Sequence, residues 1–257
     1  MAPSFTRDDF DTLMRGVWTL LIVAALGIIW LFASDYDDWV RAKRWAAVED
    51  GVLYRSAQLP PTRLEEKLVD ADIKRIIRLS GDKPNDDWQQ IENLVAGRRG
   101  IDLVVMNMAG NGTGDPAVYV EAMKILADSE ADGEAVWVHC ATGSQRTGAV
   151  AFLWQVLTMD VSVEDALDDL LWYNHRPHRN TALRPYLRRY IPRIAAELRA
   201  AGVEVRDVPE SELAALPAEC DECADLPELA AEDIPEYSED CLGCDLWPTQ
   251  PQVADVR

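Results

Sequence analysis

The sequence predicts an α/β fold with a mainly parallel central sheet flanked by helices. Short apolar runs rich in β-formers alternate with segments of helical period along residues 49–201, an alternation typical of βαβ units. The runs expected to be strands or extended segments are 51–56, 74–80, 101–108 and 135–139. Helices are expected at 61–72, 86–99, 146–159, 162–173 and 181–201, and a further one opens at Asp115-Pro116, with Asp as N-cap and Pro in the first turn.

The charge of the chain is strongly acidic and unevenly distributed. Its 257 residues include 45 acidic and 25 basic ones, and the formal net charge is -20. Such a chain binds nucleic acids poorly, so no nucleic-acid partner is expected. Sixteen of the acids lie in residues 202–257, which we expect to be a loosely ordered, cysteine-rich acidic tail.

A run of arginines interrupts this acidity. Between Asp169 and Glu197 the chain has no acidic residue, and it has Arg176, Arg179, Arg184, Arg188, Arg189 and Arg193. A local basic face on an acidic protein can attract a phosphorylated substrate. Alternatively, it is a solvated helix face that pairs with the acidic tail. The sequence leaves both interpretations open.

The N-terminal part has the pattern of a membrane anchor. Residues 16–34 are nineteen residues without a charge, close to the roughly 20 apolar residues that span a bilayer. A transmembrane helix is therefore expected there, between a tail of residues 1–15 and a juxtamembrane linker of residues 35–48, with a buried core helix as the alternative. The protein is thus expected to be a single-pass membrane protein. Its charged flanks do not decide the orientation, although the short tail ending in Arg15 favours an N-terminus inside and the bulk of the chain outside the cytoplasm.

The stretch from Val138 to Gly148 reads VHCATGSQRTG and contains the residues suited to chemistry. It follows a short buried strand and precedes a helix, so its backbone N–H groups and the positive end of the helix dipole point at one anion site. These donors favour the thiolate of Cys140, at the start of the loop. Arg146, six residues later, can hold two phosphoryl oxygens with its planar guanidinium.

This arrangement predicts a double displacement at phosphorus. The Cys140 thiolate forms a cysteinyl phosphate, a carboxylic acid protonates the leaving oxygen, and water then hydrolyses the intermediate. Thr147 can donate its hydroxyl to the sulfur, and His139 is expected to orient the loop rather than to act as a base. No cofactor is expected for catalysis. The other residues expected to line the phosphate site are Ala141, Thr142, Gly143, Ser144 and Gln145.

The segment HC-x5-R-T-G, from His139 to Gly148, resembles the signature of protein tyrosine phosphatases, and its short α/β setting resembles the dual-specificity branch. Further upstream, LYRSAQ at 53–58 resembles the YRSxQ segment that opens the small atypical dual-specificity phosphatases of bacteria, fungi and plants. The residues 108–111, followed by Asp115-Pro116, resemble the loop ahead of the helix that precedes their active-site strand.

The resemblance covers about residues 48–200 and implies that residues 49–201 form a phosphatase domain with the cysteine phosphatase fold. The expected activity is that of a membrane-anchored protein-tyrosine or dual-specificity phosphatase, a phosphoric monoester hydrolase. Phosphotyrosine or phosphoserine proteins come first as substrates, and a phospholipid or phosphosugar near the membrane comes second. The loop 141–145 has no Lys or Arg, which disfavours highly anionic substrates. The alternative is an inactive phospho-binding adaptor that uses the tail for interactions.

The general acid is open between two aspartates. Asp115 lies on the expected loop, 25 residues before Cys140, and it also has a sufficient role as N-cap. Asp82, in the loop after the strand 74–80, is the other candidate. Arg55 is either a second phosphate contact or part of an ion pair at the strand edge, and the second interpretation is favoured.

The other four cysteines form two C-x-x-C pairs in the tail. Seventeen residues separate Cys220 and Cys223 from Cys241 and Cys244, a spacing that matches a structural zinc site of four thiolates. Two disulfides are expected instead if this part of the chain faces an oxidising compartment. A third interpretation gives these cysteines no ordered role.

Overall fold

The computed structural model describes residues 14–23, 25–27 and 42–218. By its internal contacts the chain divides into two units, residues 1–41 and 42–257. In the first unit, residues 14–23 and 25–27 are helical. The elements of the second unit are, in order, β1 (Ala46–Glu49), β2 (Leu53–Ala57), α2 (Pro61–Asp70), β3 (Ile73–Arg78), α3 (Asp87–Arg99), β4 (Asp102–Val105), α4 (Pro116–Asp132), β5 (Ala135–Cys140), α5 (Arg146–Leu157), α6 (Val163–Trp172), α7 (Leu183–Ala200) and α8 (Glu210–Leu213).

The predicted transmembrane helix over residues 16–34 is corrected by the structure. Among the described residues, no helix is both long and apolar enough to cross a membrane. For the part of the chain that the structure describes, the spanning helix and the single-pass membrane location predicted with it are therefore wrong. Residues 28–34 of the predicted span lie outside the described part.

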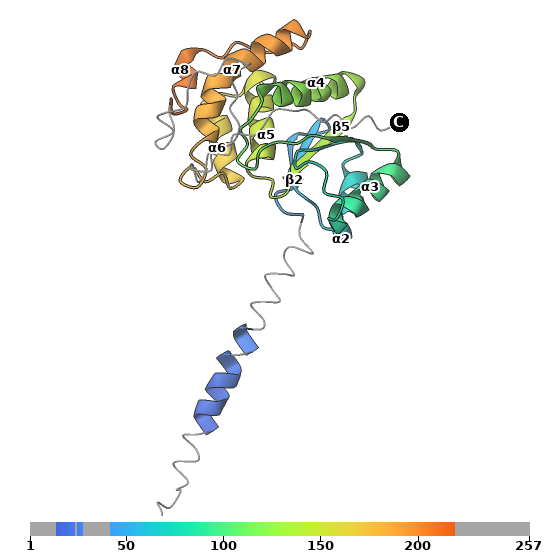
Figure 1. Ribbon diagram of the computed structural model, residues 1–257, viewed down its shortest axis with the longest axis vertical. Coiled ribbons are helices and arrows are strands. Elements are labelled where there is room, and N and C mark those ends of the chain that lie inside the picture. The colour runs from blue at the N-terminus through green and yellow to red at the C-terminus, as the bar shows by residue number, and fades with distance from the viewer. Residues whose placement is uncertain (1–13, 24, 28–41, 219–257) are drawn as a thin grey trace, which may run out of the picture. The chain divides into compact units, whose positions relative to one another are not determined.

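A sheet forms the centre of the second unit (Figure 1). It has five strands in the order β1-β2-β5-β3-β4. β1 pairs antiparallel with β2, whereas the pairs β2–β5, β5–β3 and β3–β4 are parallel. The mainly parallel sheet predicted from the sequence is thus confirmed. All six residues of β5 are buried, because this central strand has helices over both faces.

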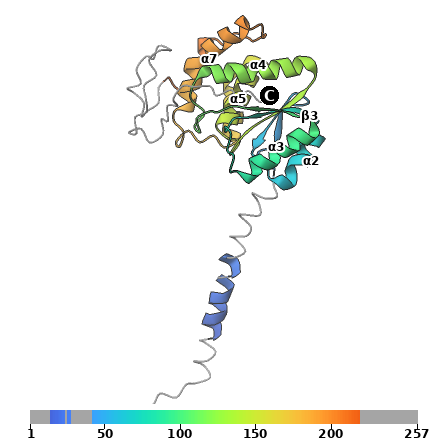
Figure 2. The same cartoon turned by 45° about the vertical axis from the view of Figure 1, so that its right-hand side comes forward.

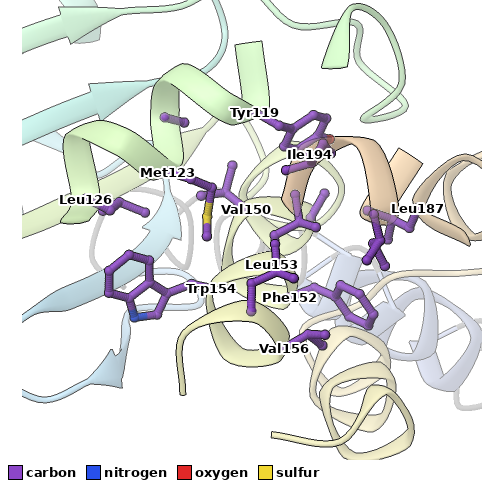
Figure 3. Packing of buried hydrophobic residues seen from close by; sticks show 14 of the residues in the cluster. Tyr119, Met123, Leu126, Val150, Phe152, Leu153, Trp154, Val156, Leu187 and Ile194 are labelled. Atoms are coloured by element: carbon purple, nitrogen blue, oxygen red, sulfur yellow. The ribbon is translucent and has the colours of Figure 1, made fainter. Parts of the chain in front are cut away.

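Helices cover the two faces of the sheet in separate groups (Figure 2). On one face, α2 and α3 enclose the smaller apolar cluster with Trp137 of β5. On the other face, α4, α5, α6 and α7 form the larger cluster, in which Met123, Leu153 and Leu187 come from three different helices (Figure 3). Ten of the twelve residues of α5 are buried. An apolar helix enclosed in this way is a core element, so its N-terminus is held firmly in place.

The residues just ahead of β1, which we call the N-terminal strap (residues 42–45), reach two distant parts of the chain. The Lys43 carbonyl accepts a hydrogen bond from the Ala57 amide at 2.9 Å. The Arg44 guanidinium donates to the Thr142 carbonyl at 2.5 Å. The strap and the first three residues of β1 lie within the stretch predicted as a linker, and the compact unit thus begins earlier in the chain than the sequence indicates.

The described residues that follow α7 are also packed against the second unit. Leu213 and Leu216 are 2% and 0% exposed and belong to the larger apolar cluster. Arg206 donates to the Val156 carbonyl at the end of α5 and pairs with Glu212 at 2.8 Å. The sequence predicts a loosely ordered tail from residue 202 onward, because acidic residues dominate there. The two leucines anchor its first part instead, since their burial stabilises an otherwise polar segment.

Candidate active site

The loop of residues 141–145 joins the end of β5 to the start of α5. Both flanking elements are enclosed by the core, so the two ends of the loop have fixed positions. Cys140 is the last residue of β5, and Arg146 is the first residue of α5. The structure therefore places the predicted nucleophile and the predicted phosphate ligand at the two ends of one short loop.

The Cys140 thiol is surrounded by hydrogen-bond donors. Cys140 is 1% exposed, and the Gly143 amide donates to its Sγ at 3.2 Å. Burial raises the pKa of the thiol, but the charge of Arg146, the hydroxyl and amide of Thr147 and the amide of Gly143 together lower it further than burial raises it. The net pKa lies below the ordinary value of 9.0. A lowered pKa increases the fraction of thiolate, which is the nucleophilic form.

Gly143 is required at the turn of the loop for two reasons. Its φ is +70°, a left-handed conformation that side chains other than glycine adopt at a cost. A Cβ at this position would also lie 2.6 Å from the carbonyl carbon of Ser56, at the end of β2. The loop thus packs directly on the backbone of the YRSAQ segment, and this contact explains why a glycine follows the cysteine at this distance.

Arg146 is positioned by backbone carbonyls from two neighbouring segments. Its Nη1 donates to the carbonyls of Leu79 at 3.3 Å and Met108 at 3.5 Å. Within the described residues, the buried Nε of Arg146 and the buried hydroxyl of Ser144 have no hydrogen-bond partner. Buried polar atoms are normally paired. These two unpaired atoms, one in the loop and one at its end, are therefore suited to the oxygens of a bound phosphoryl group.

Behind the loop lies a buried charged network that the sequence did not reveal. His139 is 0% exposed and stacks on Trp137 with ring centroids 4.1 Å apart. Its Nε2 lies 3.1 Å from Glu92, a buried residue of α3. Arg78 of β3 donates to the same carboxylate at 2.9 Å. Burial raises the pKa of Glu92, but His139 and Arg78 outweigh it, and the pKa lies below the ordinary 4.5. This network supports the predicted role of His139 in orienting the loop.

The remaining predicted residues of the loop differ in exposure. Ala141 and Thr142 are exposed, whereas Gln145 is partly buried. The Gln145 side-chain oxygen accepts a hydrogen bond from Nδ1 of His175 at 2.6 Å. Burial, followed by the charge of Arg184, lowers the pKa of His175 to about 4. His175 is therefore a neutral, buried residue that packs the segment between α6 and α7 against the loop.

Asp115, the predicted general acid, caps α4. Its carboxylate accepts a hydrogen bond from the Ala117 amide at 2.9 Å, and no hydrogen bond or ion pair of the described residues joins it to the catalytic loop. Just beyond Asp115, the Tyr119 hydroxyl of α4 donates to the Gly112 carbonyl of the preceding segment. The pKa of Tyr119 is raised by burial first and by Cys140 second, a sign that this ring lies near the thiol.

Asp82, the other candidate acid, belongs to a different neighbourhood. One of its carboxylate oxygens lies 3.5 Å from Nη1 of Arg78, and its side chain is 66% exposed. It therefore lies at the outer edge of the buried network around Glu92. The structure brings Arg78 and Asp82 together but gives Asp82 no contact with Cys140 or Arg146 among the described residues.

Comparisons with known proteins find similarity to solved structures, and this similarity is distant. No family model and no curated protein matches the chain. Solved structures do match it. TpbA from P. aeruginosa is 18% identical, with a TM-score of 0.48, over 62% of this chain and 99% of that one. PTPMT1 is 15% identical, with a TM-score of 0.45, over 62% and 98%.

The core catalytic domain of the PP-IP phosphatase SIW14 from S. cerevisiae is similar to the chain as well. Its identity is 20% and its TM-score 0.48, over 65% of this chain and 99% of that domain. TpbA is also known in complex with pTyr and PTPMT1 in complex with PI(5)P.

The four tail cysteines lie outside the described residues, and with them the predicted zinc or disulfide chemistry. In the described part of the chain, Cys140 is the free cysteine, and no cluster of His, Cys, Asp and Glu could hold a metal ion. The zinc site of Cys220, Cys223, Cys241 and Cys244 stays a prediction.

Proposed function

We propose that the protein is a cysteine-dependent phosphatase that hydrolyses phosphomonoesters. The observation that supports this most strongly is the buried Cys140 thiol with a lowered pKa, placed six residues before an arginine whose Nε is unpaired among the described residues. A nucleophile and an oxyanion ligand at opposite ends of one anion-binding loop are the two groups that phosphoryl transfer to a side chain requires.

The reaction takes place in two displacements. The thiolate lone pair of Cys140 forms an S–P bond while the bond from phosphorus to the leaving oxygen breaks, and that oxygen receives a proton from a carboxylic acid. Water then attacks phosphorus while the carboxylate left by the first step takes a proton from it, and the S–P bond breaks, which regenerates the thiolate and the acid and releases inorganic phosphate. Arg146 and the loop amides hold the equatorial oxygens in both steps. The chemistry needs no metal and no cofactor.

The experiment that tests this proposal is phosphate release by the full chain. We expect the reduced protein to release inorganic phosphate from an aryl phosphate in the presence of EDTA, and prior alkylation with iodoacetate to abolish the release. If a well-folded protein binds phosphate but releases none, the phosphatase proposal is contradicted and the phospho-binding adaptor takes its place.

We propose Asp115 as the general acid. The segment that holds it borders the loop through Gly112, whose Cβ position lies 3.4 Å from the Gln145 carbonyl. Asp115→Asn keeps an N-cap acceptor for the Ala117 amide but cannot donate a proton. We therefore expect kcat to fall by about 10²-fold, with an unchanged melting temperature. The measurement is steady-state hydrolysis of esters with leaving groups of increasing pKa.

The same series of esters provides the control for Asp115. Loss of an acid should affect esters with poor leaving groups most and should spare those with good ones. Asp82→Asn is the matched variant, and we expect it to leave kcat unchanged. A normal kcat in Asp115→Asn for every ester would show that this residue serves the helix cap alone.

For the substrate we propose phosphotyrosine or phosphoserine proteins first, and a phospholipid or phosphosugar second. The distribution of ion pairs supports a preference for acidic sequences around the phosphorylated residue. Arg188 pairs with Glu210 and Arg193 with Glu197. His175, which bonds to Gln145 of the loop, lies in the segment between α6 and α7. In that segment and the first turn of α7, among the described residues, three arginines have no acidic partner within 4.0 Å: Arg176, Arg179 and Arg184. Unneutralised charge beside a catalytic loop raises the local concentration of anionic ligands.

We expect the double variant Arg176→Gln/Arg179→Gln to discriminate against acidic phosphopeptides. Both residues are exposed, so the variant should fold normally. Its kcat/KM should fall by about 10-fold for a phosphotyrosine peptide with flanking acids and stay unchanged for a neutral aryl phosphate. Arg98→Gln, which removes an exposed arginine of α3 that pairs with Glu65, is the control. Equal losses on both substrates would contradict this preference.

A further inference from the structure

Arg55 of β2 is an arginine without contact with water. It is 1% exposed, which is rare for this residue type unless it is paired. The sequence favoured an ion pair at the edge of a strand, but β2 lies inside the sheet between β1 and β5. Burial lowers the pKa of Arg55 to about 10, so the guanidinium is still charged at neutral pH. A charge buried in this way needs partners that define its position.

Three groups from two other parts of the chain hold this guanidinium. Its Nη2 donates to the carbonyl of Gly143 in the catalytic loop at 3.0 Å. Its Nη1 lies 3.5 Å from a carboxylate oxygen of Asp169 in α6. The Tyr173 ring, one residue beyond α6, has its centroid 3.9 Å from the guanidinium carbon, within the range of a cation–π contact. Arg55 thus links β2, α6 and the loop.

The hydrogen bond from Arg55 is accepted by the carbonyl of Gly143, the loop residue with the greatest backbone freedom. The Gly143 amide donates to the Cys140 sulfur, while its carbonyl accepts from Arg55. Since glycine can adopt many backbone conformations, a contact on its carbonyl fixes the Gly143–Ser144 peptide plane and thereby restricts the rotation of the preceding plane, whose amide points to the sulfur. Those planes carry amides that the loop must direct at the sulfur and at the phosphoryl oxygens.

We propose that Arg55, held by Asp169 and Tyr173, is a positioning residue that keeps the Gly143 peptide oriented toward the Cys140 thiolate. This inference rests on the proposed phosphatase function, since it assigns Arg55 a role in that loop. Arg55 also adds positive charge near the sulfur, because the charge of Cys140 acts on Arg55 as a favourable interaction. The other groups that face the thiol are Arg146 and Thr147 of α5 and Tyr119 of α4.

The test is the pH dependence of Cys140 alkylation by iodoacetamide in the full chain, which requires no turnover. The tail cysteines are replaced by serine in every variant, so that the reaction reports Cys140 alone. We expect Arg55→Gln to move the midpoint about 1 pH unit higher and to lower kcat by about 10²-fold, as displacement of a catalytic group does. Arg55→Lys keeps the charge without the planar fork and should show the kcat loss with a smaller change of the midpoint.

Asp169→Asn keeps the inference testable if Arg55→Gln does not fold. The Asp169 side chain is 32% exposed, so this variant should fold, and its midpoint should move in the same direction by a smaller amount. The inference is overturned if Arg55→Lys and Asp169→Asn both alkylate Cys140 with the parent's midpoint and differ only by a lower melting temperature. Arg55 would then have a structural role alone. If the variants show the expected shifts of the alkylation midpoint but the parent protein releases no phosphate, the proposed function is overturned and the positioning role of Arg55 stands.

Discussion

The Cys140→Ser variant is expected to lose phosphate release by at least about 10⁴-fold, because removal of a nucleophile eliminates the covalent step. The site lowers the pKa of a thiol through Arg146, Thr147 and Gly143. A serine hydroxyl in the same place stays protonated at neutral pH and is a weak nucleophile. The measurement is phosphate release from an aryl phosphate by parent and variant at equal concentrations.

The same variant should keep its fold and its affinity for anions. Cys140 and serine differ little in size, and the donors around the sulfur come from other residues. We therefore expect a melting temperature close to that of the parent and retained binding of inorganic phosphate. Because the pKa of the thiol is lowered, the acid limb of kcat/KM in the parent should lie below the ordinary thiol pKa. Full activity in Cys140→Ser would exclude Cys140 as the nucleophile.

Glu92→Ala is expected to destabilise the protein by about 3–5 kcal/mol, the cost of breaking a buried ion pair. The carboxylate is 2% exposed and lies between Arg78 at 2.9 Å and His139 at 3.1 Å. Its removal leaves the fully buried guanidinium of Arg78 without its closest acid. The measurement is denaturant unfolding of parent and variant at pH 7, compared through the transition midpoint.

The variant Glu92→Gln removes the negative charge of this side chain but keeps its shape, so it measures the contribution of the charge to stability. The amide fills the same space and should destabilise less than alanine. The folded-state pKa of Glu92 lies below 4.5, so the charge stabilises the fold fully above the unfolded-state pKa. The stability difference between parent and Glu92→Gln should therefore be complete above pH 4.5 and shrink as the pH falls through the folded-state pKa. A difference independent of pH would contradict a charged Glu92.

The position of the loop 141–145 between a buried strand and a helix could be predicted from the sequence because its requirements are local. Cys140 and Arg146 lie six residues apart, and the strand and helix that fix them are contiguous with them in the chain. The six-residue spacing then indicates that Cys140 and Arg146, at the two ends of the loop, face the same anion. The alternation of strands and helices was recognisable for a similar reason, since each element shows its own periodicity.

The supporting residues could not be predicted because their partners are distant in the chain. Glu92 lies 47 residues before His139, and Arg55 lies 88 residues before Gly143. An acid in a helix and an arginine in a strand read as surface residues when the fold is unknown. For the apolar N-terminal run the prediction was wrong in another way. Its composition predicted a membrane-spanning helix, but no helix among the described residues is long and apolar enough to be one.

The N-terminal strap sets a limit for anyone who shortens this chain to isolate its catalytic part. A fragment that begins at residue 49, where the predicted domain starts, would lose the Lys43 carbonyl and leave the Ala57 amide at the end of β2 without its acceptor. It would also remove Arg44 from the Thr142 carbonyl. Low activity in such a fragment would reflect a damaged loop rather than an inactive enzyme, so a truncated protein should retain residue 42.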